Sequence, residues 1–240
     1  MKVIAHGNNL YQLSYLGFVN CYLVREADGF TLVDSAVKGC GKAIVKAAQK
    51  LDQPIVRLLL THAHVDHVGA LDELHELLPA AEVLITTRDA RFMAGDMSLD
   101  PTEPVDKLRG GWPIVKTHPT RTLEDSDRVG SLEVIASPGH TPGHASFFDL
   151  RDGGLIAGDA FQTLGGVAVS GTWVPLFPLP AMSTWHKPTC LESARKLWTF
   201  APTWMAVGHG RLLKQPLTAM DRAIAALARE LQRKEPRQAA

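Results

Sequence analysis

Three histidines and an aspartate lie within a short segment of this chain. The segment from His62 to His67 reads H-A-H-V-D-H. Imidazole nitrogens and carboxylate oxygens are ligands that zinc and other divalent transition metals use in proteins. An isolated histidine is usually a surface residue or a hydrogen-bonded core residue, but four ligand-type side chains packed this closely indicate a metal site. We therefore expect this segment to bind metal.

A predicted strand leads into the first two histidines. The apolar run 55–60 is short and contains β-branched residues, which favours a buried strand over a helix. Residues two apart in an extended chain point to the same side, so His62 and His64 can share one metal ion.

The residues after the cluster predict a helix. Apolar side chains recur at helical spacing over about 66–78, and the acidic side chains mostly face away from them. Asp66 and His67 begin this helix and are turned away from the first pair. They are therefore free to bind a second metal ion.

Three more ligand-type residues follow predicted strand ends. The strand 132–136 leads to a Pro- and Gly-containing turn that carries His140, and a hairpin over 147–158 ends at Asp159. A strand at 203–207 ends at the sequence Gly-His-Gly, whose histidine is His209. On sequence alone, Asp159 would be interpreted as a turn residue, although a carboxylate has two oxygens and can bridge two ions.

The H-x-H-x-D-H pattern resembles the signature of the metallo-β-lactamase superfamily, and the later residues follow in that superfamily's order. The resemblance implies two divalent metal ions, with the following ligands: His62, His64 and His140 on the first ion, Asp66, His67 and His209 on the second, and Asp159 between them. It implies zinc as the metal, with iron or manganese as alternatives.

The resemblance also implies roles for two neighbouring residues. An aspartate at the position of Asp34, the last residue of the predicted strand 30–34, commonly supports the metal loop in this superfamily, while the sequence alone allows a turn or helix-capping role equally. His144 has no ligand role in the family, which favours a structural hydrogen bond.

The implied fold is an α/β (α+β) class structure, a four-layer αβ/βα sandwich of two mixed sheets with helices on the outer faces. The predicted order of strands and helices is compatible with it but would not select it. A chain of 240 residues favours a single domain over 1–240, with a polar tail at 235–240. The irregular segments 93–118 and 161–186 are predicted substrate-side loops. A solvated connection for the first, and core packing or a homodimer contact for the second, explain them nearly as well.

Composition excludes some partners. The chain has 25 basic and 25 acidic residues, which predicts neither nucleic acid nor a membrane as a partner and leaves a small-molecule substrate. The three cysteines are isolated, and the N-terminus has no apolar run of secretory type. These features predict a cytoplasmic protein.

By resemblance, the chain is a hydrolase in which a metal-bridging hydroxide attacks a small ester, thioester or lactone and Asp66 relays a proton. Asp159 differs from the cysteine or serine of class B β-lactamases, and about thirty residues after His209 leave no room for a glutathione-binding helical domain. Acyl-homoserine lactonases have a tyrosine where this chain has Gln162. The alternatives are an iron-dependent redox enzyme, a phosphodiesterase or nuclease, and a non-catalytic metal-binding protein.

Overall fold

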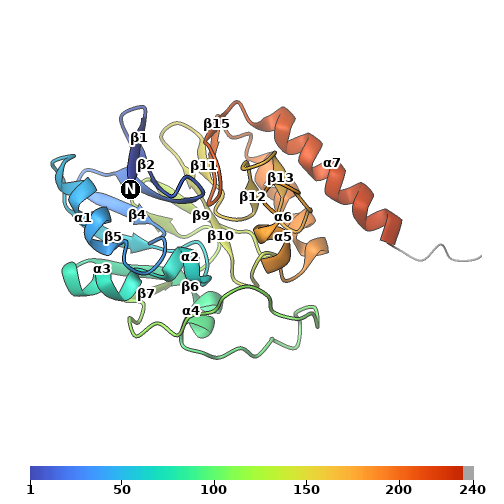
Figure 1. Ribbon diagram of the computed structural model, residues 1–240, viewed down its shortest axis with the longest axis horizontal. Helices are drawn as coiled ribbons and strands as arrows, with labels where there is room; N and C mark the ends of the chain where they lie inside the picture. The colour runs from blue at the N-terminus through green and yellow to red at the C-terminus, as the bar shows by residue number, and fades with distance from the viewer. Residues whose placement is uncertain (235–240) are drawn as a thin grey trace, which may run out of the picture.

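The computed structural model describes residues 1–234, so the tail predicted at 235–240 lies outside the described residues. Two β-sheets pack face to face, and helices cover their outer faces (Figure 1). This arrangement confirms the predicted four-layer sandwich.

The first sheet begins antiparallel and becomes parallel at its fourth strand. In spatial order its strands are β1 (Lys2–His6), β2 (Leu10–Tyr15), β3 (Val19–Arg25), β4 (Phe30–Val33), β5 (Ile55–Leu59), β6 (Glu82–Thr86) and β7 (Arg121–Leu123). The strand β1 was not predicted, because this edge strand is largely exposed and has no buried apolar face.

The second sheet is antiparallel except between β11 and β14. In spatial order its strands are β15 (Leu213–Lys214), β14 (Trp204–Ala206), β11 (Gly154–Ile156), β10 (Ala145–Asp149), β9 (Leu132–Ala136) and β8 (Arg128–Val129). Two successive antiparallel pairings restore the original direction, so β9, β11 and β14 all end at the same edge of the sheet.

Helices lie outside both sheets (Figure 1). They are α1 (Gly41–Gln49), α2 (Val65–Val68), α3 (Leu71–Leu77), α4 (Thr87–Met93), α5 (Leu179–Ser183), α6 (Lys187–Thr199) and α7 (Leu217–Lys234). Alternate residues of β5 show how the layers form: Leu58 packs in the core shared with α1 and α3, whereas Leu59 packs between the two sheets. No helix in residues 1–234 combines the length and apolar character needed to cross a membrane.

Two predicted segments differ in detail. The helix expected over 66–78 is divided into α2 and α3, because the backbone leaves the helical conformation at Ala70 (φ −98°, ψ 10°). The segment 161–186 is not wholly irregular, since it contains the hairpin of β12 (Phe161–Gln162) and β13 (Ala168–Val169) and also α5.

Candidate metal centre

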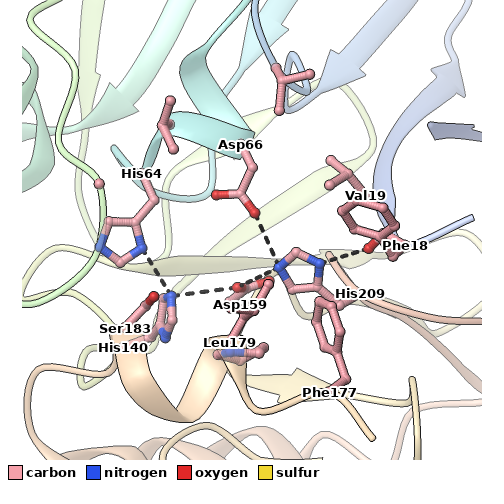
Figure 2. Close-up of a pocket in the computed structure, with 14 residues that line it drawn as sticks. Phe18, Val19, His64, Asp66, His140, Asp159, Phe177, Leu179, Ser183 and His209 are labelled. Carbon is pink, nitrogen blue, oxygen red and sulfur yellow. Dashed lines mark hydrogen bonds and ion pairs between the residues drawn. The ribbon is translucent and has the colours of Figure 1, made fainter. Parts of the chain in front are cut away.

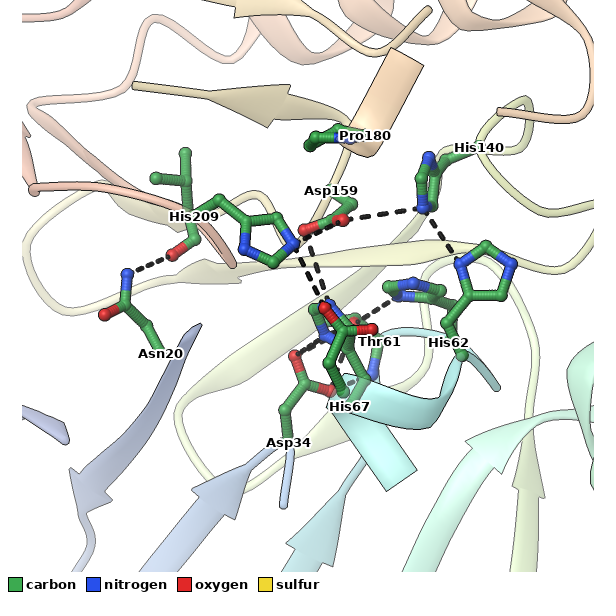
Figure 3. A network of polar contacts seen from close by, with 12 residues as sticks. Asn20, Asp34, Thr61, His62, His67, His140, Asp159, Pro180 and His209 are labelled. Carbon is green, nitrogen blue, oxygen red and sulfur yellow. Dashed lines mark hydrogen bonds and ion pairs between the residues drawn. The ribbon is translucent and has the colours of Figure 1, made fainter. Parts of the chain in front are cut away.

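The ends of five strands converge at one edge of the sandwich. Asp34 follows β4, and the 62–67 segment follows β5 in the first sheet. His140, Asp159 and His209 follow β9, β11 and β14 in the second sheet. Figures 2 and 3 show these side chains pointing toward one another from opposite sheets.

All seven ligand-type residues predicted from the sequence lie in this cluster. Their potential ligand atoms form three groups in which every atom lies within 4.8 Å of the others: His62, His64 and His140; His62, His67 and Asp159; and Asp66, His67 and His209. We call the first the histidine half and the third the mixed half.

Asp159 lies between the two halves. One of its carboxylate oxygens, Oδ2, is 3.4 Å from His140 Nε2 and 3.1 Å from His209 Nε2. The other, Oδ1, is 3.5 Å from His67 Nε2. A carboxylate in this position can contact groups of both halves at once.

Hydrogen bonds fix the tautomers in the histidine half. His64 Nε2–H donates to the carbonyl oxygen of Arg109 at 3.0 Å. His140 Nδ1–H donates to Ser170 Oγ at 2.7 Å; this hydroxyl bonds to Thr184 Oγ1, which in turn donates to a backbone carbonyl. The nitrogens left without a proton are His64 Nδ1 and His140 Nε2. These two nitrogens lie 3.0 Å apart, so their lone pairs face each other with no hydrogen atom between them.

Hydrogen bonds to Asp34 and Thr61 hold the outer N–H groups of His67 and His62 in the same way. His67 Nδ1–H donates to Asp34 Oδ2 at 2.8 Å. Thr61 Oγ1 donates to the same carboxylate and accepts from His62 Nδ1–H at 2.9 Å (Figure 3). The predicted support of the metal loop by Asp34 is therefore present as direct contacts.

His209 completes the set, because its Nδ1–H donates to the carbonyl oxygen of Phe18 at 2.7 Å (Figure 2). All five histidines thus hold their outer N–H on a fixed acceptor and turn the other ring nitrogen inward. Three inward atoms, His62 Nε2, His67 Nε2 and Asp159 Oδ1, are buried without a hydrogen-bond partner among the described residues. Such orphaned polar atoms are costly unless a ligand satisfies them, and metal ions suit this nitrogen and oxygen donor set. The residues present fit a two-metal centre.

Burial keeps the histidine half neutral. Loss of solvent lowers the pKa of His64 to about 4 and lowers those of His62 and His140 well below the ordinary value. Neutral imidazole is the form that binds metal, so this half needs no proton loss near neutral pH.

The mixed half has the opposite electrostatics. Burial alone would lower the pKa of His209, but the Asp159 and Asp66 carboxylates outweigh it and raise the pKa to about 10. Asp34, Asp159 and Asp66 likewise raise the pKa of His67 well above its ordinary value. Burial would raise the pKa of Asp66, but the positive charges of His67 and His209 outweigh it and lower that pKa.

Asp89 on α4 joins the two loops that carry the histidine half, and the sequence analysis missed it. Its wholly buried carboxylate accepts from the backbone N–H of Ala63 and the hydroxyl of Thr141 through Oδ2, and from the backbone N–H of Gly143 through Oδ1. The lengths of these bonds are 2.8–2.9 Å. Asp89 therefore fixes the separation of His64 and His140 without facing the site.

His144 is a positioning residue. Its Nε2 accepts from the backbone N–H of Asp159 at 3.0 Å, and its Nδ1–H donates to Ser137 Oγ at 2.9 Å. Both ring nitrogens are used, and burial lowers the pKa of this imidazole to about 3. The predicted structural hydrogen bond is confirmed.

Two glycines leave space that the centre requires. A Cβ at Gly208 would lie 2.1 Å from Asp159 Oδ1. Gly110 has φ +92°, and a Cβ there would lie 2.5 Å from His64 Nε2. Any side chain at either position would displace a group of the cluster.

A cavity of about 280 Å³ opens onto the cluster. Its wall includes His64, Asp66, His140, Asp159 and His209, together with parts of the two segments predicted as substrate-side loops, namely Gly111, Phe177, Leu179, Pro180 and Ser183. Gln162 is buried, and its amide donates to the carbonyls of Leu164 and Phe177 instead of facing this cavity.

The family model of the metallo-beta-lactamase superfamily matches residues 14–209. The chain belongs to this superfamily, as its fold and its cluster of histidines and aspartates indicate.

Among its relatives is YobT of Bacillus subtilis (strain 168), described as an uncharacterized protein, which is 48% identical over 86% of this chain and 89% of YobT. The probable metallo-hydrolase YflN of the same organism is 29% identical over 80% of each chain. A similar solved structure is that of TTHA1623 in a di-iron-bound form, with a TM-score of 0.61 and 26% identity over 87% of this chain and 95% of that one.

Proposed function

We propose that this protein is a binuclear metallohydrolase that cleaves a small ester, thioester or lactone. One observation carries the proposal: the outer N–H of every histidine in the cluster is held by a fixed acceptor, so five imidazole nitrogens and two carboxylates converge on one cluster beside the cavity. Membership of a superfamily that includes metallo-hydrolases supports the reaction type.

The histidine half would hold one ion and the mixed half a second, with Asp159 bridging them. When bound, the ions would supply Lewis acidity, which makes water a nucleophile near neutral pH and polarises a substrate oxygen. Asp34 and His144 keep His67 and Asp159 in position through the hydrogen bonds described above.

Asp66 is suited to proton transfer. Both Asp66 and Asp159 line the cavity, but the Asp66 side chain is 28% exposed whereas that of Asp159 is 3% exposed. One oxygen of Asp66, Oδ2, lies 3.3 Å from His209 Nε2. The carboxylate can therefore remain a ligand through one oxygen while the other accepts a proton from water in the cavity and releases it to solvent.

The test begins with elemental analysis of protein purified without added metal, followed by assays on a small ester, thioester, lactone and phosphodiester panel. We expect two equivalents of a divalent metal and turnover of one carbonyl class. His64→Gln should remove about one equivalent and lower activity more than about ten-fold. His118→Gln, an exposed position outside the cluster, is the matched control and should change neither.

A redox function is the second candidate, because a relative at 26% identity has been solved in a di-iron-bound form. Tightly bound iron with oxygen consumption and no hydrolysis would replace the hydrolase proposal with this one.

A further inference from the structure

We propose that the substrate of this site is an uncharged molecule with an apolar group next to the cleaved bond, and that glutathione thioesters and other carboxylate-bearing esters are poor substrates. The inference rests on the hydrolase function proposed above and narrows its substrate class. It follows from the chemistry of the cavity wall.

An aromatic wall stands beside the mixed half. The rings of Phe18 and Phe177 pack with centroids 6.2 Å apart, and Phe177 lies 5.1 Å from the ring of His209 (Figure 2). Because the carbonyl of Phe18 also holds His209, the wall is attached directly to a predicted metal ligand. A substrate group next to the reacting carbonyl would therefore contact aromatic carbon.

The mouth of the cavity is apolar as well. Val65 and Leu179 both line the cavity, and yet they are 44% and 53% exposed to solvent. Covering large exposed apolar side chains beside a pocket with an apolar group removes them from water, which is favourable. A substrate with a hydrocarbon group would supply that cover.

Among the described residues, the cavity wall offers no cationic side chain for a substrate carboxylate away from the predicted metal ligands. Among the described residues that line it, none is lysine or arginine, and the charged side chains other than histidine are Asp66 and Asp159. Arg109 contacts the cluster through its carbonyl oxygen. A carboxylate bound against Phe18, Phe177 and Leu179 would lose water without gaining a cation, which is unfavourable.

Two matched substrate pairs test the inference on the metal-loaded enzyme. Phenyl butyrate and phenyl hemisuccinate differ by a carboxylate on the acyl side. The butyryl thioesters of N-acetylcysteine amide and of N-acetylcysteine differ by one carboxylate on the leaving group, a charge of the kind that glutathione also carries. We expect kcat/KM for the neutral member of each pair to be larger by about ten-fold or more, since an unpaired buried charge is rejected strongly.

Substitutions then locate the selectivity. Phe177→Arg should raise kcat/KM for the charged members relative to the neutral ones, whereas Phe177→Leu should retain the preference. Leu150→Arg places the same charge on an exposed turn at the opposite end of the β10–β11 hairpin from Asp159, and should change nothing. Thermal unfolding of each variant shows that it is folded.

The outcomes separate the two proposals. Equal or better turnover of the charged members would overturn this inference and leave the hydrolase standing. A folded Phe177→Arg variant with an unchanged preference would also overturn it. Absence of turnover on all four substrates and on the lactone of the earlier panel would overturn the hydrolase function, and this inference with it.

Discussion

The two halves of the centre contain the same type of ligand in opposite electrostatic states. In the histidine half, burial dominates: the imidazoles of His62, His64 and His140 are neutral because solvent is excluded and their outer N–H groups end on hydroxyls and a carbonyl. In the mixed half, carboxylates dominate and hold His67 and His209 in the protonated form.

The difference shows that one cluster can be prepared for metal in two ways. The histidine half is already in its binding form, and its facing lone pairs at 3.0 Å disfavour the metal-free state. The mixed half is stabilised without metal by its own ion pairs, so a cation must displace protons to enter. We therefore expect the halves to differ in affinity and in pH dependence.

The largest effect should come from breaking the link between the halves. Asp159→Asn keeps the shape of the side chain and removes the charge that both halves face, so we expect hydrolysis to fall by about 100-fold or more, together with loss of bound metal. Asp221→Asn, an exposed position on α7, is the control. Activity and elemental analysis measure both effects. An Asp159→Asn protein with full activity and two metal ions would contradict the bridging role.

A change at Asp89 should weaken the histidine half selectively. Asp89→Asn places an amide N–H₂ group where the carboxylate accepts from Ala63, Thr141 and Gly143, so we expect about ten-fold weaker binding of one equivalent of metal and a stability loss of about 1–3 kcal/mol. Competition with a chelator measures the affinity, and chemical denaturation measures the stability.

Asp72→Asn is the matched control for this experiment. Asp72 also accepts from two backbone N–H groups and one hydroxyl, at Lys116 and Thr117, but it touches neither ligand loop. It should lower stability without changing metal affinity. If both variants lose metal equally, Asp89 acts through general stability and not through loop position.

The protons released on metal binding should distinguish the two halves of the centre in the intact protein. Because His67 and His209 carry protons that metal must displace, loading metal-free protein with zinc at neutral pH should release at least two protons, one from each imidazole. Calorimetric titration in buffers of different ionisation enthalpy counts them. His64→Gln should lose a metal equivalent without changing the count. Release of no protons would show that the mixed half is neutral before metal binds.

The sequence predicted the residues of the cluster because each one lies after a strand end and belongs to a short motif. The supporting groups had no such signal. The acceptors of His64, His140 and His209 are two carbonyls and a serine hydroxyl that lie 30 to 191 residues away along the chain. A carbonyl is present at every residue, so only the folded chain shows which one is used.

A sequence pattern at Asp89 could have predicted the helix α4, but it would have given the wrong role for the Asp89 side chain. Thr86 and Asp89 have the spacing of a helix N-terminal box, and Thr86 Oγ1 does accept from the backbone N–H of Asp89 at the start of α4. That pattern predicts a helix where none was expected. It assigns the aspartate side chain to capping, whereas tertiary packing turns it toward the loops of His64 and His140.

The smallest effect should be on the stability of the metal-free protein, which the two halves of the centre change in opposite directions with pH. His64 has a folded pKa of about 4, below the unfolded value of about 6.5, so the folded chain binds fewer protons between these values and loses stability as pH falls through them. His209 has a folded pKa of about 10, so its contribution is complete below about 6.5 and is lost as pH rises toward 10. The melting temperature should therefore be highest near pH 6.5–7 and fall on both sides, by about 2–4 °C for each kcal/mol lost.

His64→Gln should flatten the acid side and His209→Gln the alkaline side. Because the two halves titrate in opposite directions, a melting temperature that changes in one direction only would show that one half does not have the electrostatics described here.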